Sequence, residues 1–154
     1  MVAGVIVDGH EKLAVELLWR HEDEAEAQRT PMPLRYNDEY VAYFRVERLG
    51  MYRYKVRAWL DAFGTWQDQF RRRVEGKVQK SELETELRDG ASLLRRAAEH
   101  ASTDDRARLL GYVERFEAGE TEAALEADVV PLARNNDPAE GAIESDWLGV
   151  RVDP

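Results

Sequence analysis

The sequence predicts an α+β fold in which an immunoglobulin-like antiparallel β-sandwich carries a helical-bundle insertion. Three observations support this prediction. Apolar and polar residues alternate over residues 1–64, apolar residues recur at helical spacing over 65–137, and a strand-like run returns within 138–154. We therefore expect sandwich strands in the first segment, the insertion in the second, and a linker with a returning strand in the third.

Short strands separated by turn signals fill the first segment. The apolar run 5–7 and the alternating run 13–20 are separated by Asp8-Gly9-His10, which is typical of a tight turn. The acidic run 22–26 is expected to be a solvated loop. Because proline cannot donate to a ladder, Pro31-Met32-Pro33-Leu34 is expected to form an edge strand or an extended segment.

Residues 39–61 are predicted to form a β-hairpin that turns at Leu49-Gly50. The second strand of this hairpin has two contrasting faces, because strand side chains share a face at every second position. The face expected to point into the core carries Tyr52, Tyr54, Val56, Ala58 and Leu60. The opposite face carries Arg53, Lys55, Arg57, Trp59 and Asp61, so Trp59 is an indole on an otherwise charged face.

Helical spacing in the second segment predicts four helices. Ser81-Glu82-Leu83-Glu84 matches a capping box, in which the serine caps a backbone N–H and the last glutamate reaches back. Pro131 is expected to kink or end the last helix. The helices are predicted to begin near Gln67, at Ser81, at Thr103 and at Thr121.

The composition excludes several classes of protein. With 154 residues, 44% of them hydrophobic and 34% charged, the chain can build an ordinary folded core. A net charge of −9 argues against binding to nucleic acid or to an anionic membrane surface. The chain has no cysteine and no apolar run near the ~18 residues of a membrane span, so we expect a cytoplasmic protein.

No motif in the sequence predicts catalysis, a cofactor or a metal. His10, His21 and His100 are scattered and lack a second ligand at metal-binding spacing. A catalytic carboxylate pair needs one member in an apolar pocket, and Asp61 beside Trp59 is the nearest approach to that pattern. We favour an ion pair at the strand end or a helix cap for Asp61, and we assign no catalytic, cofactor-binding or metal-binding residue.

Trp59 and Trp66 allow two interpretations. An exposed indole offers a flat apolar face on which a sugar ring stacks, so both residues are candidates for contact with carbohydrate. The alternative is that helices of the insertion dock on this face of the sheet and bury both side chains. We favour burial, because both residues lie where the hydrophobic period changes from two to 3.6.

Several segments together resemble the amino-terminal domain of the α-1,4-glucan:maltose-1-phosphate maltosyltransferases of the α-amylase superfamily. The resemblance covers essentially the whole chain, including a helical insertion at this place. The segments are Val7-Asp8-Gly9-His10-Glu11, Pro31-Met32, Gly50-Met51-Tyr52 and Val56-Arg57-Ala58-Trp59-Leu60-Asp61-Ala62-Phe63-Gly64-Thr65-Trp66.

The resemblance implies a role inside a larger enzyme. Members of this family transfer maltosyl units from maltose 1-phosphate to the non-reducing ends of α-glucans, with retention, in glycogen or capsular α-glucan synthesis. Their catalytic carboxylates lie on a following (β/α)8 barrel that this chain lacks, because such a barrel alone needs about 250 residues. The resemblance therefore implies a non-catalytic scaffolding domain whose partners are the barrel of the same polypeptide and, in a homodimer, a second copy. A stand-alone module that binds α-glucan is the alternative.

Overall fold

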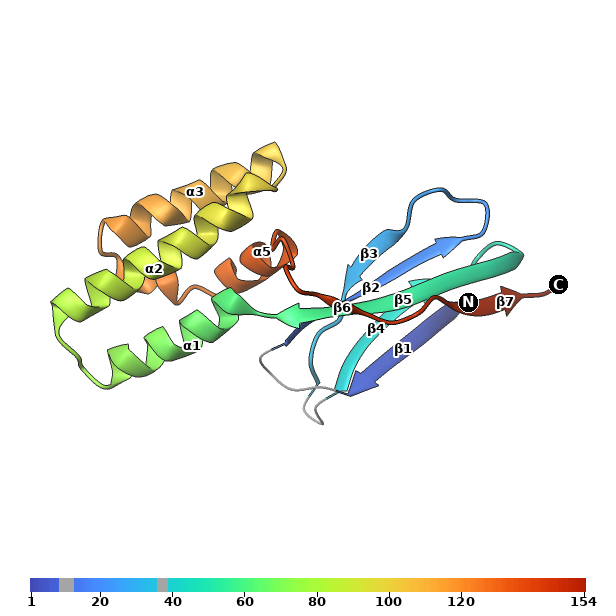
Figure 1. Ribbon diagram of the computed structural model, residues 1–154, viewed down its shortest axis with the longest axis horizontal. Coiled ribbons are helices and arrows are strands. Elements are labelled where there is room, and N and C mark those ends of the chain that lie inside the picture. The colour runs from blue at the N-terminus through green and yellow to red at the C-terminus, as the bar shows by residue number, and fades with distance from the viewer. Residues whose placement is uncertain (9–12, 36–38) are drawn as a thin grey trace. The chain divides into compact units, whose positions relative to one another are not determined.

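The chain folds into two compact units. The computed structural model describes residues 1–8, 13–35 and 39–154, and the predicted turn at Gly9 and His10 lies outside these residues. The strand unit comprises Met1–Leu60 and Ala139–Pro154, and the helical unit comprises Asp61–Pro138 (Figure 1). The predicted α+β class is confirmed, since helices and antiparallel sheets are both present.

The larger sheet of the strand unit is built on the pairing of two long strands. Strands β2 (Leu13–His21) and β5 (Gly50–Leu60) run antiparallel. Strand β3 (Gln28–Pro31) pairs with the other edge of β2. The last two strands, β6 (Ile143–Glu144) and β7 (Leu148–Val152), both pair with β5.

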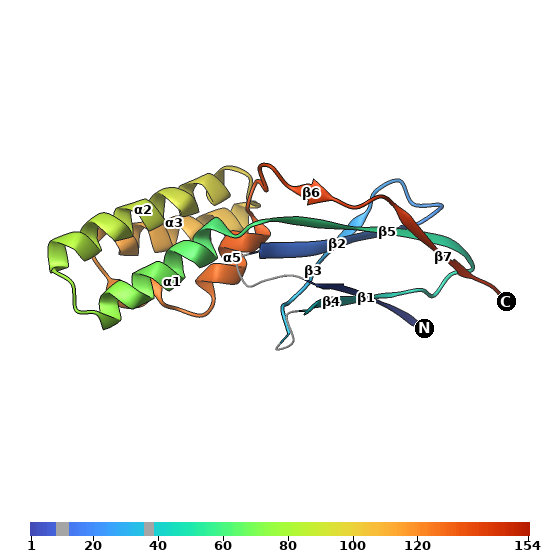
Figure 2. The ribbon, with the colours of Figure 1, turned by 60° about the horizontal axis from the view of Figure 1, so that its bottom comes forward.

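The smaller sheet shows that the predicted hairpin at residues 39–61 is wrong. Strand β4 (Glu39–Arg45) pairs with β1 (Val2–Asp8), whereas β5 pairs with β2. Residues 46–49 therefore carry the chain from one sheet to the other, and Figure 2 shows the two sheets as separate layers. Alternation predicts that both strands exist, but it carries no information about the partner with which each strand exchanges hydrogen bonds.

The inner faces of the two sheets enclose one apolar core. The rings of Trp19 and Phe44 stack with centroids 5.1 Å apart, and Tyr40 Oη donates to the carbonyl oxygen of Leu13 at 2.9 Å. The predicted inward face of β5 is correct in part: Tyr52 is buried, but Leu60 is 71% exposed at the end of the strand. The buried members are Val15, Leu17, Met32, Tyr40, Ala42, Phe44, Val46 and Tyr52.

The helical unit contains three long and two short helices. The long helices are α1 (Ala62–Glu75), α2 (Lys80–Glu99) and α3 (Thr103–Glu117). The predicted single fourth helix is wrong, because the chain forms α4 (Thr121–Ala124) and α5 (Val129–Asn135). The break precedes the proline at position 131, which lies in the first turn of α5, where a missing N–H costs little.

The predicted capping box on α2 is also wrong. The N-cap is Gln79, whose side chain makes no capping hydrogen bond, and Ser81 lies inside the first turn. The carbonyl oxygen of Ser81 instead accepts from Thr85 Oγ1 at 3.1 Å. Helix α3 does have a side-chain cap, since the Ser102 hydroxyl accepts from the Asp105 N–H.

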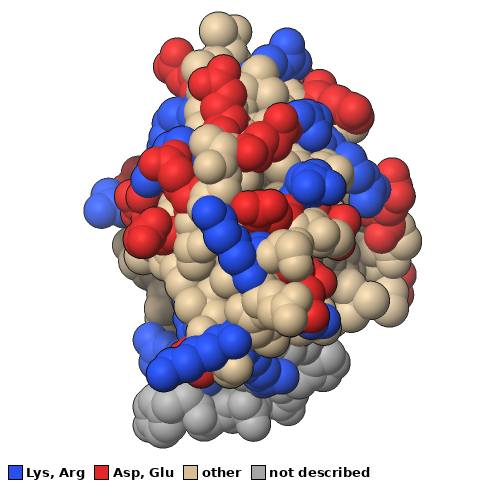
Figure 3. Space-filling view, turned by 90° about the vertical axis from the view of Figure 1, so that its left-hand side faces the viewer, with Lys and Arg blue, Asp and Glu red and all other residues tan. Residues whose placement is uncertain are grey.

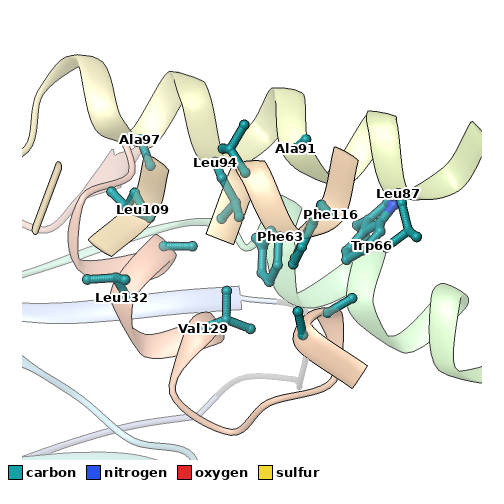
Figure 4. Close-up of a cluster of buried hydrophobic side chains, with 14 of the residues drawn as sticks. Phe63, Trp66, Leu87, Ala91, Leu94, Ala97, Leu109, Phe116, Val129 and Leu132 are labelled. Carbon is teal, nitrogen blue, oxygen red and sulfur yellow. The ribbon is translucent and has the colours of Figure 1, made fainter. Parts of the chain in front are cut away.

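Aromatic stacking organises the core of the helical unit (Figure 4). The indole of Trp66 stacks on Phe70 and Phe116 with centroids 5.0 and 5.7 Å away, and its Nε1 donates to the carbonyl oxygen of Glu86. Gly90 of α2 lies directly against this indole, since a Cβ built there would be 2.5 Å from Trp66 Cζ2. Close packing of the ring on α2 therefore requires a glycine at this position.

A polar cluster ties the segment after α4 to α3. Glu126 accepts from Tyr112 Oη at 2.9 Å and pairs with Arg115 Nη2 at 2.9 Å. The hydrogen bond from Arg115, followed by that from Tyr112, lowers the pKa of Glu126 below its ordinary value. Burial and the hydrogen bond to Glu126 raise the pKa of Tyr112.

None of the helices in the described part of the chain is long and apolar enough to cross a membrane.

Gly90→Ala is expected to destabilise the protein, although alanine usually favours a helix over glycine by about 0.5–1 kcal/mol. The new methyl group has to displace Trp66, and overpacking of this kind costs about 1–3 kcal/mol. Gly111→Ala on α3 is the matched control, because a Cβ there meets nothing within 4 Å, and it should be neutral or stabilising. Urea denaturation measures both changes, and equal effects of the two substitutions would contradict the role of Gly90.

Glu126→Gln is expected to weaken folding in a pH-dependent way. Since the folded-state pKa of Glu126 lies below the ordinary 4.5, its contribution to the free energy of unfolding is fully present above that pH. The contribution disappears as the pH falls through the folded value. The stability difference between wild type and Glu126→Gln should therefore narrow in acid, as followed by urea denaturation at several pH values. Glu114→Gln, which removes a charge from α3, is the control and should show a smaller difference at neutral pH.

Candidate functional site

The outer face of the larger sheet carries a buried carboxylate between two arginines. Glu16 on β2 is only 5% exposed, and it lies opposite Arg57 of β5 in the register. Arg29 donates from Nε and Nη2 to Glu16 Oε2 at 3.0 and 2.8 Å, and Arg57 Nη2 donates to Oε1. Both carboxylate oxygens are therefore engaged across three neighbouring strands. The arrangement stabilises the sheet, since a buried charge has to be paired.

Trp59 lies next to this cluster and is 5% exposed. It packs against Ala14 of β2 and Ala139, and the Arg57 guanidinium lies 5.6 Å from the ring centroid. Trp59 is buried, as predicted, but the expected cover by helices is wrong. The residues that pack against it, Ala14 and Ala139, belong to the strand unit, and Ala139 is far away in the sequence. Among the described residues, Trp59 Nε1 is buried without a hydrogen-bond partner.

Trp66 is also buried, at 7% exposure, as predicted, but not against a sheet face. It belongs to the core of the helical unit, whereas Trp59 belongs to a cluster of the strand unit. The two tryptophans therefore belong to the buried clusters of different units. In the folded state, neither presents an open face on which a sugar ring could stack.

Asp61 acts as a helix cap and as one half of an ion pair. Its Oδ1 accepts from the Gly64 N–H at 2.9 Å, and its Oδ2 accepts from Arg134 Nε and Nη2 at 3.1 and 2.6 Å. Asp61 is 3% exposed. The predicted cap and ion pair are both confirmed, and together they occupy the acceptor positions that general acid–base catalysis would need free.

Trp147, to which sequence analysis assigned no role, has an exposed indole. It is 39% exposed and lies between β6 and β7. Lys55 Nζ and Arg20 Cζ lie 4.8 and 5.7 Å from its ring centroid. One signal was present in the sequence: Trp147 is in phase with Arg151, and Leu148 with Val150 and Val152, so alternation separates the indole from the apolar positions.

His21 has a structural role, and the described residues contain no group of three or more His, Cys, Asp or Glu side chains that could hold a metal ion. His21 is 2% exposed, its Nε2 donates to the carbonyl oxygen of Leu49 at 2.7 Å, and its Nδ1 accepts from the Asp23 N–H. Both ring nitrogens are thus used to hold two connections of the strand unit. A histidine with both nitrogens engaged has no position left for a metal.

The helical unit has a shallow hollow of about 400 Å³ between α2 and α3. Arg88, Ser92, Arg95 and Glu117 line it, and Arg95 is paired with Glu117. Basic and acidic side chains are interspersed over the face seen in Figure 3. This mixture of signs does not create the one-signed field that concentrates a charged ligand.

Asp61→Ala is expected to destabilise the protein by about 2–4 kcal/mol, because it removes a cap and leaves Arg134 without its partner. Asp61→Asn should cost less, since an asparagine side chain still caps the helix while losing the charge. Urea denaturation measures both. If the two variants are equally stable, the cap on the Gly64 N–H contributes nothing.

Trp147→Phe is expected to remove most of the tryptophan fluorescence that iodide can quench. Trp59 and Trp66 are 5% and 7% exposed, whereas Trp147 is 39% exposed. Iodide quenching of the native and of the urea-unfolded protein is compared for wild type and Trp147→Phe. Trp66→Phe, which removes a buried indole, is the matched control. Unchanged quenching in Trp147→Phe would contradict the described exposure of Trp59, Trp66 and Trp147.

Comparison with known proteins identifies the family. The model of the family described as α-1,4-glucan:maltose-1-phosphate maltosyltransferase, domain N/S, matches residues 1–154. A protein of that name from Salinibacter ruber is 51% identical over 154 residues, which are 100% of this chain and 23% of that protein. One from Chlorobaculum tepidum is 32% identical over 81% of this chain and 18% of its own length. The chain thus spans about a quarter of these relatives or less, and it belongs to the domain N/S family of the α-1,4-glucan:maltose-1-phosphate maltosyltransferases.

Proposed function

We propose that this chain is a non-catalytic, amino-terminal scaffolding and dimerisation domain of a maltosyltransferase. The longer polypeptide would transfer maltosyl units from maltose 1-phosphate to α-1,4-glucans in glycogen or α-glucan synthesis. The observation that carries the proposal is the match over all 154 residues to a domain that makes up 23% of the relative from Salinibacter ruber. The proposal places the catalytic (β/α)8 barrel, which needs about 250 residues, in the rest of such a protein.

The paired charges of the chain support a scaffolding role. Glu16 and Asp61 are the buried carboxylates of the described residues, and each is occupied by arginine. Such groups stabilise a structure and are poor proton donors or acceptors for a substrate.

We also propose that the strand unit is an immunoglobulin-like sandwich, since two antiparallel sheets enclose one core. A cytoplasmic location follows from the proposed donor, because a charged sugar phosphate does not cross a bilayer unaided.

Exchange of the domain tests this function. Residues 1–154 replace the matching 23% of the Salinibacter ruber maltosyltransferase, and phosphate release from maltose 1-phosphate is measured with an α-1,4-glucan acceptor. The chimera should retain activity, and the isolated chain should release no phosphate. A truncated relative that lacks the region is the control, and it should lose activity or its oligomeric state. If the truncated relative is as active and as oligomeric as the intact one, the scaffolding role is wrong.

A second candidate function is binding of α-glucan, and the exposure of Trp147 is the observation that favours it. Trp59 and Trp66 would have to be uncovered before they could stack on sugar, whereas the Trp147 ring already offers part of its surface. Titration of the chain with maltohexaose, followed by heat and by tryptophan emission, tests the idea. Binding that Trp147→Ala abolishes and Trp59→Phe preserves would support it, and no response at millimolar sugar would exclude it.

A further inference from the structure

Basic side chains gather on the outer face of the larger sheet, the face that carries Glu16. Lys55 of this face pairs with Glu144, and Arg57 pairs with Glu16, so both are neutralised. Further along the same strands, the alternation of β2, β5 and β7 places more basic residues on this face. They are Arg20, Arg53 and Arg151, and we call them the arginine cluster.

The arginine cluster makes no ion pair with a carboxylate of the described residues. Arg20 donates from Nη1 to the carbonyl oxygen of Glu24 at 2.9 Å, which supplies no negative charge. Glu22 follows Arg20 by two residues, but its Oε1 lies against Gly50, 2.7 Å from where a Cβ on that glycine would be. The cluster therefore remains uncompensated in a chain whose net charge is −9.

The register of the sheet brings the cluster together. Arg20 of β2 lies directly opposite Arg53 of β5. On the other side of Arg53 lies Gly149 of β7, and Arg151 is the next residue of β7 on the same face. Like charges directly opposite each other on neighbouring strands destabilise a sheet. An anion that binds between the guanidinium groups relieves this repulsion.

An exposed indole borders the arginine cluster. Lys55 Nζ of β5 and Arg20 Cζ of β2 lie over the Trp147 ring, 4.8 and 5.7 Å from its centroid. Since the two cations come from neighbouring strands, the ring lies across the outer face of the sheet. Trp147 is 39% exposed. The ring surface that faces away from the two cations can therefore stack on the flat part of a ligand.

The chemistry of the cluster favours a phosphate group over other anions. One arginine is sufficient for a carboxylate, as Arg134 is for Asp61. Several guanidinium groups match a dianion with three terminal oxygens, and the arginine fork binds phosphate oxygens bidentately.

The size of the ligand is limited by the charge of the whole chain. A net charge of −9 repels a long polyanion or an anionic membrane, because these present negative charge over a large area. A small anion interacts mainly with the charges within the Debye length of about 8 Å. Close to the arginine cluster, those charges are positive.

We propose that Arg20, Arg53 and Arg151 form a binding site for a phosphate group on the outer face of the larger sheet. The group is inorganic phosphate or the phosphate of a sugar ester whose ring stacks on Trp147. The inference does not rest on the proposed scaffolding role. It also differs from the second candidate function in its ligand, because a neutral α-glucan has no charge for the arginines to bind.

Isothermal titration calorimetry of the chain with inorganic phosphate, glucose 1-phosphate and maltose tests the ligand. Both phosphate compounds should bind, and maltose should bind at least about tenfold more weakly, since it lacks the charged group. Tighter binding of glucose 1-phosphate identifies a sugar ester as the ligand, whereas equal binding identifies free phosphate. If neither compound binds at millimolar concentration, or if maltose binds as well as they do, the proposal is wrong.

Arg53→Gln tests the site. It should weaken phosphate binding about tenfold, because it removes hydrogen bonds between two charged groups. Arg72→Gln is the matched control, since it removes the same charge from an exposed position of α1 and should bind like wild type. Unchanged binding in Arg53→Gln, or equal weakening in both variants, would overturn the site.

Urea denaturation gives a readout that a merely structural role of Arg53 would not produce. In chloride, Arg53→Gln should be more stable than wild type, because it removes the repulsion with Arg20. Phosphate at the same ionic strength should stabilise wild type and Arg72→Gln more than Arg53→Gln, since a ligand of the folded state raises stability. Phosphate also stabilises proteins generally, and Arg72→Gln reports that effect. Equal stabilisation of all three proteins by phosphate would contradict the proposal.

Discussion

The antiparallel ladder between β2 and β5 is the interaction on which the strand unit depends. It runs without interruption from Leu13↔Leu60 to His21↔Tyr52. Every other strand of the larger sheet pairs with one of these two, and the ladder supplies one wall of the apolar core of the strand unit. The charged face of the same ladder holds Glu16 between its arginines, so the two faces stabilise the sheet by different means. Apolar burial acts on one side, and paired charges act on the other.

The longer strands and the long helices were predictable, because each depends on a local period, whereas the two-residue strand β6 has no period and was not predicted. The partners of the strands were not predictable in the same way. Residues 39–61 alternate as two strands separated by a turn signal, which is equally compatible with a hairpin and with a crossing between sheets. The crossing is settled by pairing with β1 and β2, segments far away in the sequence. The break between α4 and α5 was missed because proline tolerates the first turn of a helix as well as it ends one.

In the candidate site, too, local features were predictable from the sequence and distant partners were not. The cap and ion pair of Asp61 were predictable, because an aspartate just before a helical period is typical of an N-cap. Its partner Arg134 was not, since 73 residues separate the two. The burial of Trp59 was expected, but Ala139 and the returning segment that covers it could not be read from the residues around the indole. The residues around Trp59 predict on which face of the strand its indole lies. Whether the indole is exposed depends on a segment that is far away in the sequence.

The way the helical unit joins the strand unit has a consequence for the evolution of this domain. The chain leaves β5 at Leu60 and re-enters the strand unit at Ala139, and Ala58 lies opposite Ile143 in the ladder. Both ends of the 78-residue excursion from Asp61 to Pro138 therefore meet at one point of a single sheet. Removing that excursion would leave β5 and β6 as neighbours joined by an ordinary hairpin loop. The pairing order of the strands is therefore independent of the length of the helical unit.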